Sequence, residues 1–219
     1  PDPDDLATVL DDAAALLQCR APDAALTVLD RVGPAAGDER RRWLLLQWQA
    51  ARDARDHRRA ALALQRLSQG SVETLQALNL PVTDRPLPVA SALDLQAEHL
   101  EAEGRSAAAA GLLQTPASDP LATAERLAEA TRVLAGAGQG PQALGLLPRT
   151  LDQAAAAAAW GLAGQLLSRQ RQLELEAGQS AAAAATNQRR ERLARRLEDG
   201  MGLRASLRSA RADGTRQPA

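Results

Sequence analysis

Few residues of this chain belong to types that do chemistry. The single cysteine, Cys19, has Arg20 beside it, a cation of the kind that accompanies reactive thiolates. A nucleophilic cysteine also needs a histidine to take its proton, and the chain offers only His57 and His99. Cys19 ends an apolar-periodic segment that is typical of an amphipathic helix, so we assign it a structural role.

The two histidines do not form a recognisable metal motif. His57 and His99 are distant in the sequence, and neither has a second histidine four positions away. His99 has glutamates around it, but one histidine among surface carboxylates is a weak ligand set. We predict no metal site, and we place His99 on a solvated helix face. One cysteine also excludes a disulfide within the chain.

Other sites for cofactors and acid–base chemistry are also missing from the pattern. The glycines at 136, 138 and 140 match a dinucleotide loop by count alone, since no strand precedes them and no lysine exists for a phosphate loop. Aspartates near the N-terminus stand where they would cap a helix and complement its dipole. We therefore predict no catalytic residue, no cofactor and no enzymatic activity.

Two kinds of side chain remain for binding. Arginines crowd residues 189–196, either as the solvated face of a terminal helix with a Glu191–Arg195 pair or as a docking surface for an acidic partner. The chain has three tryptophans, a type enriched at interface hot spots. Trp43 and Trp48 are five positions apart, about 500° around a helix, so we expect one in the core and one exposed.

Charge distribution limits the classes of partner. The net charge is −1, which argues against a general nucleic-acid or membrane-surface binder. Residues 166–219 hold eleven arginines and six acids, a balance of 11 − 6 = +5, which leaves −6 for residues 1–165. The basic end is thus C-terminal, and we expect a protein or peptide partner, with an acidic one favoured there. No apolar run is long enough to insert into a membrane.

A recurring phrase indicates which elements position these residues. Gly104 and Gly138 each open a short phrase that ends in an alanine five residues on. Each alanine has a leucine four residues after it and another nine before it, where two antiparallel helices would touch. The two copies begin about 34 residues apart, which is the length of one helix–turn–helix repeat.

Composition favours the same all-α class. Lys, Ile, Phe and Tyr are absent and all 26 cations are arginine, a bias that indicates a GC-rich bacterial genome. Leucine and alanine, both strong helix formers, must build the core. Strand-forming residues are so scarce that we expect no sheet.

The same phrase divides the chain into about five helix pairs. The matching alanines are Ala25, Ala60, Ala109, Ala143 and Ala183, and only the interval from Ala60 to Ala109 is much longer than one repeat. We expect a first helix to Gln18, a helix from 151 to 177, and a last helix from 180 to about 199. The domain boundaries are 1–199 for one helical-repeat domain and 200–219 for a flexible, arginine-rich tail.

The long interval between Ala60 and Ala109 marks an insertion at 71–90. A short capped helix leads there into a stretch with three prolines in eight residues, which cannot continue a helix. Insertions in repeat arrays map to loops on one face. The two interpretations are a passive linker and a loop that contacts a partner.

These repeats resemble those of the tetratricopeptide repeat (TPR) family. The alanine-x3-leucine part of its pattern is present four times, over about four fifths of the chain, whereas its Tyr, Phe and helix-A Gly positions are not met. A plain antiparallel bundle would share the periodicity. The resemblance implies a right-handed superhelix whose first helices line a groove. The residues we predict to contact a partner are Arg41, Trp43, Gln47, Arg55, Gln96, His99, Arg126, Arg132, Arg189, Arg192 and Arg196.

The resemblance implies a non-catalytic scaffold that binds a partner protein or peptide in its groove. The alternative is that the chain is a periplasmic repeat segment of a larger bacterial envelope or exopolysaccharide-export protein. In that interpretation the segment recruits a modifying enzyme. The chain starts at Pro1 and its only methionine is Met201, so we expect a processed protein or an excerpt of a longer one. Cytoplasm and periplasm both fit.

Overall fold

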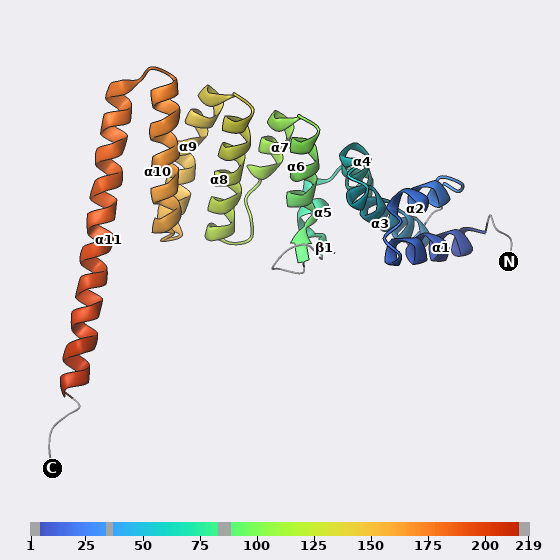
Figure 1. Cartoon of the computed structure of the whole chain (residues 1–219), viewed down its shortest axis with the longest axis horizontal. Coiled ribbons are helices and arrows are strands. Elements are labelled where there is room, and N and C mark those ends of the chain that lie inside the picture. Colours follow the sequence, from blue (N-terminus) through green and yellow to red (C-terminus); the bar gives the residue numbers. More distant parts are fainter. Residues whose placement is uncertain (1–4, 34–36, 83–88, 215–219) are drawn as a thin grey trace, which may run out of the picture. The chain divides into compact units, whose positions relative to one another are not determined.

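The computed structural model describes residues 5–33, 37–82 and 89–214, with the side chains of Asp38 and residues 201–214 left out. The chain forms two compact units, residues 1–117 and 118–219. The division into one helical-repeat domain over 1–199 and a tail stays a prediction. Both units consist of antiparallel helix pairs (Figure 1). We describe each by itself.

Unit 1 contains three helix pairs and the insertion. The pairs are α1 (Leu6–Gln18) with α2 (Pro22–Leu29), α3 (Asp38–Asp53) with α4 (His57–Leu67), and α6 (Ala92–Ala102) with α7 (Ser106–Leu113). Asp5 caps α1 by accepting a hydrogen bond from the Thr8 amide, as predicted for the aspartates near the N-terminus, and Pro22 opens α2 at its first turn. Asp38 is the first residue of α3 rather than its cap, which is Gly37.

The insertion is folded into unit 1. It forms α5 (Val72–Ala77) and two short strands, β1 (Asn79–Pro81) and β2 (Val89–Ser91), which pair antiparallel with Leu80 opposite Ala90. Our expectation of no sheet was therefore wrong. Leu75, Leu80 and Val82 are buried in the core cluster of unit 1, so this part of the insertion is not a passive linker. Residues 83–88 lie outside the described residues.

Unit 2 contains the last two pairs, α8 (Pro120–Gly136) with α9 (Gly140–Ala156) and α10 (Trp160–Glu176) with α11 (Ser180–Gly214). The helix predicted from 151 to 177 was wrong, because α9 continues through Pro148 and the break comes at 157–159. The backbone of α11 stays helical to Gly214, past the end expected near 199, and residues 215–219 lie outside the described residues. Buried Thr186 of α11 donates to the Glu174 carboxylate of α10 at 3.1 Å.

The helix pairs of both units close with the same turn. The residue after the C-cap of the first helix has positive φ in each: Arg20, Arg55, Gly104, Gly138 and Gly178. At Gly138 its own amide donates to the Ala135 carbonyl at 3.0 Å, and the next amide, of Gln139, donates to Leu134 at 2.9 Å. This is the Schellman pattern, which satisfies the last carbonyls of a helix. The recurring phrase of the sequence begins at this left-handed residue.

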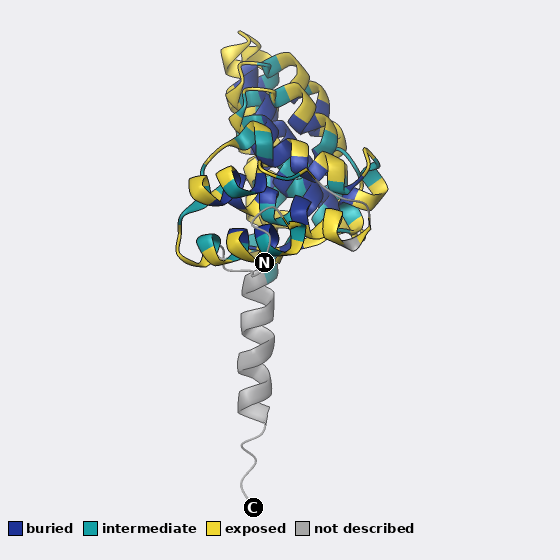
Figure 2. Ribbon diagram, turned by 90° about the vertical axis from the view of Figure 1, so that its right-hand side faces the viewer, coloured by how far each residue is buried: buried dark blue, intermediate teal, exposed yellow. Residues whose placement is uncertain are grey.

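The core lies between the helices of each pair and its neighbours (Figure 2). In unit 1 it is built from leucine, alanine, valine and the two tryptophans Trp43 and Trp48. In unit 2 Leu127, Leu147 and Leu166 are fully buried, one each from α8, α9 and α10. Small alanine faces, such as Ala143 and Ala154, let adjacent helices approach closely.

Candidate protein-binding site

An open cleft of about 790 Å³ lies in unit 1, where α3, α4 and α5 meet. Its size is within the range of pockets that hold small ligands or side chains of a peptide. The arginine cleft, as we call it, is lined by Gly37, Arg40, Arg41, Leu44, Arg66, Leu67, Gln69, Thr74, Ala77 and Leu78.

The antiparallel pairing of α3 and α4 brings the cationic side chains together. Arg40 and Arg41 lie in the first turn of α3, and Arg66 lies in the last turn of α4. The start of one helix and the end of the next adjoin in a hairpin, so these residues meet although they are distant in the sequence. All three side chains are exposed.

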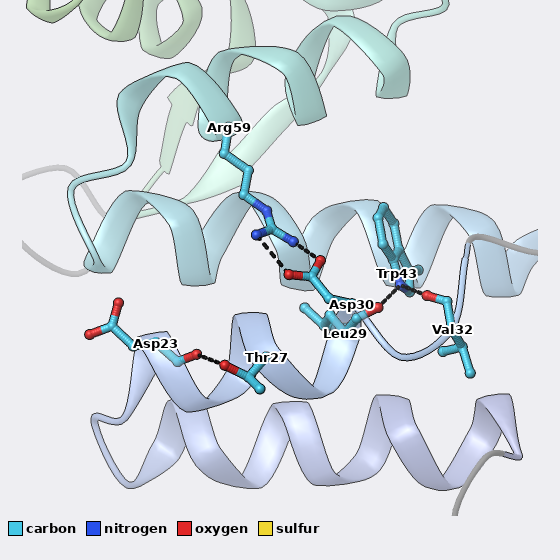
Figure 3. A network of polar contacts seen from close by, with 7 residues as sticks. All are labelled: Asp23, Thr27, Leu29, Asp30, Val32, Trp43 and Arg59. Atoms are coloured by element: carbon cyan, nitrogen blue, oxygen red, sulfur yellow. Dashed lines mark hydrogen bonds and ion pairs between the residues drawn. The ribbon is translucent and has the colours of Figure 1, made fainter.

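The described lining of the arginine cleft contains three arginines and no acid. Within the described side chains none of Arg40, Arg41 and Arg66 forms an ion pair. Neighbouring arginines do: Arg42 reaches Asp11 at 2.6 Å, and Arg59 pairs with Asp30 through two hydrogen bonds (Figure 3).

The floor of the cleft is apolar. Leu44 is buried, while Leu67 and Leu78 are half-buried and present the remainder of their surface to the opening. A lining that combines three arginines with leucine side chains suits a ligand that carries both carboxylates and an apolar group.

The α5 wall of the cleft is held by a local hydrogen-bond network. Ser71 caps α5 by accepting from the Thr74 amide at 3.2 Å, and its hydroxyl donates to the Glu73 carboxylate at 2.8 Å. Backbone hydrogen bonding, and then the Ser71 hydroxyl, hold the pKa of Glu73 below its usual value near 4.5.

This network predicts an acid-dependent change in the wall. A lowered folded pKa contributes stability above the unfolded pKa, and this contribution disappears as pH falls through the folded pKa of Glu73. An NMR titration of the Glu73 carboxyl should give a midpoint below 4.5. In Ser71→Ala the midpoint should rise only part of the way back, because the backbone bonds remain. An unchanged midpoint in that variant would contradict a role for the hydroxyl.

The two histidines lie against each other. His57 of α4 and His99 of α6 face each other with 3.1 Å between their Nδ1 atoms, and their ring centroids are 5.4 Å apart. His99 is buried rather than on a solvated face, because α4 packs on α6. Within the described ranges, no three His, Cys, Asp or Glu side chains gather closely enough to hold a metal ion.

The tryptophans also differ from expectation. Trp43 and Trp48 are both buried, since α3 has α1 and α2 on one side and α4 on another. The Trp43 indole N–H donates to the Leu29 and Val32 carbonyls, at 3.2 Å each (Figure 3), so we remove Trp43 from the partner-contacting set. Trp160 is the exposed one, at the start of α10.

The other predicted groove residues are not gathered in one described pocket. Of the set, only Arg41 lines the arginine cleft. Gln47 is buried on α3, Arg55 occupies the left-handed turn position after it, and Gln96 is half-buried on α6. In unit 2, Arg126 is half-buried on α8, and Arg132 binds Glu129 of its own helix at 2.6 Å.

The predicted basic surface lies on α11. Arg189, Arg192 and Arg196 are exposed there, and the predicted Glu191–Arg195 pair forms at 3.9 Å. Both the solvated face and the docking surface remain interpretations of this segment.

Comparison with solved structures identifies the architecture. Crystal structures of a Podosopora anserina kinesin light chain with nearly identical TPR-like repeats, and of a single-substitution form of it, are similar to this chain. The TM-scores are 0.51 and 0.50 at 14% identity, over 90% and 91% of this chain and 98% and 99% of those chains. The fold is TPR-like. No family model matches the sequence, and no curated protein matches it.

The TPR-like arrangement shows why sequence reasoning missed most of the cleft. Its α5 wall comes from the insertion, which has no counterpart in the repeat pattern, and our groove residues were chosen on first helices only. A usable signal was present in the arginines at 40–42 and 66, which a helix hairpin must bring to the same end.

In the part of the chain that the structure describes, no helix is long and apolar enough to cross a bilayer.

Proposed function

We propose that this chain is a non-catalytic scaffold that binds a segment of another protein in the arginine cleft. The observation that carries the proposal is the cleft itself: an open cavity with an apolar floor and three arginines that form no ion pair among the described side chains. Repeat arrays use such surfaces on rigid helices to position partners, with each helix pair held by its neighbours.

The features of the cleft support binding rather than chemistry. Arginine presents forked donors to carboxylates, and leucine side chains offer contact area for an apolar residue. The lining contains no histidine, cysteine or carboxylate that would serve as nucleophile or base among the described residues. An enzyme would need such a group in the cavity.

Site-specific photo-crosslinking tests the proposal. A photoreactive amino acid in place of Ala77, an exposed lining residue, should capture a partner protein in cells of the source organism. The matched control replaces Ala107, also an exposed alanine, on α7 outside the cleft. The same adducts from both positions, or none from Ala77, would show that the cleft is not where a partner binds.

A further inference from the structure

We infer that the occupant of the arginine cleft is an acidic peptide segment in which carboxylates flank an apolar side chain. This inference rests on the proposed function and specifies the chemistry of the partner. It concerns a surface made by the insertion helix α5 and the open ends of α3 and α4, away from the turn that joins them.

Charge gives the first reason. Unit 1 pairs several of its arginines internally, as Arg42 with Asp11 and Arg59 with Asp30. Arg40, Arg41 and Arg66 stay exposed around one cavity with no described acid in its lining. Clustered like charges repel one another, and a ligand with several carboxylates removes that repulsion.

Geometry gives the second reason. The three guanidinium groups come from two helices, two from α3 and one from α4, with Thr74 and Gln69 as further polar groups of the lining. Each guanidinium can bind one carboxylate in a forked manner. A single small anion would bind only some of these arginines, whereas successive acidic side chains of a peptide can reach several of them.

The floor gives the third reason, and it distinguishes a peptide from an inorganic anion. Half-buried Leu67 and Leu78 line the cleft together with the three arginines and buried Leu44. Phosphate or citrate would gain nothing from these apolar side chains. A leucine-like side chain between two acids would cover this apolar surface. It would also exclude water from the contacts between carboxylates and arginines, and those contacts are stronger without water.

Fluorescence anisotropy with defined peptides tests the inference. One labelled peptide carries three carboxylates and two leucines, a second has amides in place of the acids, and a third has serines in place of the leucines. We expect the first to bind, and its Kd to rise at least about tenfold in the amide and serine forms and in higher salt.

The decisive variant is the triple change Arg40→Gln, Arg41→Gln and Arg66→Gln, which should raise the Kd of the acidic peptide at least about tenfold. Its matched control, Arg20→Gln, Arg31→Gln and Arg58→Gln, removes the same charge from exposed sites of unit 1 outside the cleft and should leave the Kd nearly unchanged. Circular dichroism verifies that both are folded, and Arg66→Gln alone serves if the triple variant is not.

Four results would overturn the inference: no binding of the acidic peptide, equal binding of its amide form, equal weakening by both triple variants, or displacement by inorganic phosphate at concentrations similar to those of free peptide. The last result would assign the site to small anions. Capture of a partner from Ala77 alongside any of these results would keep the proposed function and reject only the acidic chemistry.

Discussion

Trp43→Ala is expected to lower the free energy of unfolding of unit 1 by about 3–5 kcal/mol. Trp43 is only 4% exposed, so truncation leaves a large cavity in the core cluster. It also removes the indole N–H that binds the Leu29 and Val32 carbonyls at the end of α2. Both losses act at the junction between the first two helix pairs.

Urea unfolding followed by far-ultraviolet circular dichroism measures this effect. The matched control is Trp160→Ala, the same change at a side chain that is 42% exposed, and surface changes of this kind usually stay within about 0.5 kcal/mol. Equal losses in the two variants would mean that Trp43 does not anchor the core. Trp48 stays in place as a fluorescent reporter of unit 1.

Leu147→Ala is expected to lower the free energy of unfolding of unit 2 by about 2–5 kcal/mol. Leu147 is fully buried on α9, in the repeat position that follows Ala143 by four residues. Repeat arrays are stabilised by contacts between neighbouring helix pairs, so a cavity here weakens the contact of α9 with both α8 and α10.

Thermal and urea unfolding of Leu147→Ala beside Leu121→Ala provide the comparison. Leu121 lies on α8 of the same unit and is 45% exposed, so its truncation removes much less buried surface. If Leu147→Ala unfolded like the control, the alanine-x3-leucine register that defines the repeat would be wrong in this unit.

The helix pairs could be predicted from the sequence because their turn leaves a local signature. A glycine such as Gly104 or Gly138 marks the left-handed position, and the alanine five residues on marks where the second helix touches the first. Both positions are set by residues that are close in the sequence. Caps such as Asp119, which accepts from the Ala122 amide, are local in the same way.

Features that depend on distant packing could not be predicted. Pro148 lacks the N–H that would bond to the carbonyl four residues before it, yet α9 continues because Leu146, Leu147 and Thr150 around it are buried. Strands β1 and β2 form although Val89 is the one strong strand former among their six residues, because Leu80 packs into the core of unit 1. The contact of His57 with His99 depends on α4 lying against α6.

The candidate site was only partly predictable for the same reason. Arg41 was named from its place on a first helix, and it lines the cleft. Arg66 and the α5 residues join it through the packing of three helices, which no spacing rule in the repeat contains. Trp43 was misplaced because a helix inside an array has neighbours on more than one side, so two faces can be buried.

The shared turn explains how this chain tolerates such irregular spacing. At each pair, the hydrogen bonds that end the first helix come from the two residues that follow its C-cap, as when Arg105 donates to the Leu100 carbonyl at 2.8 Å. No neighbouring pair is needed to complete them. A hairpin of this kind is complete without its neighbour, so the chain can place a longer stretch between α4 and α6 without disturbing either pair, and that stretch supplies a wall of the cleft.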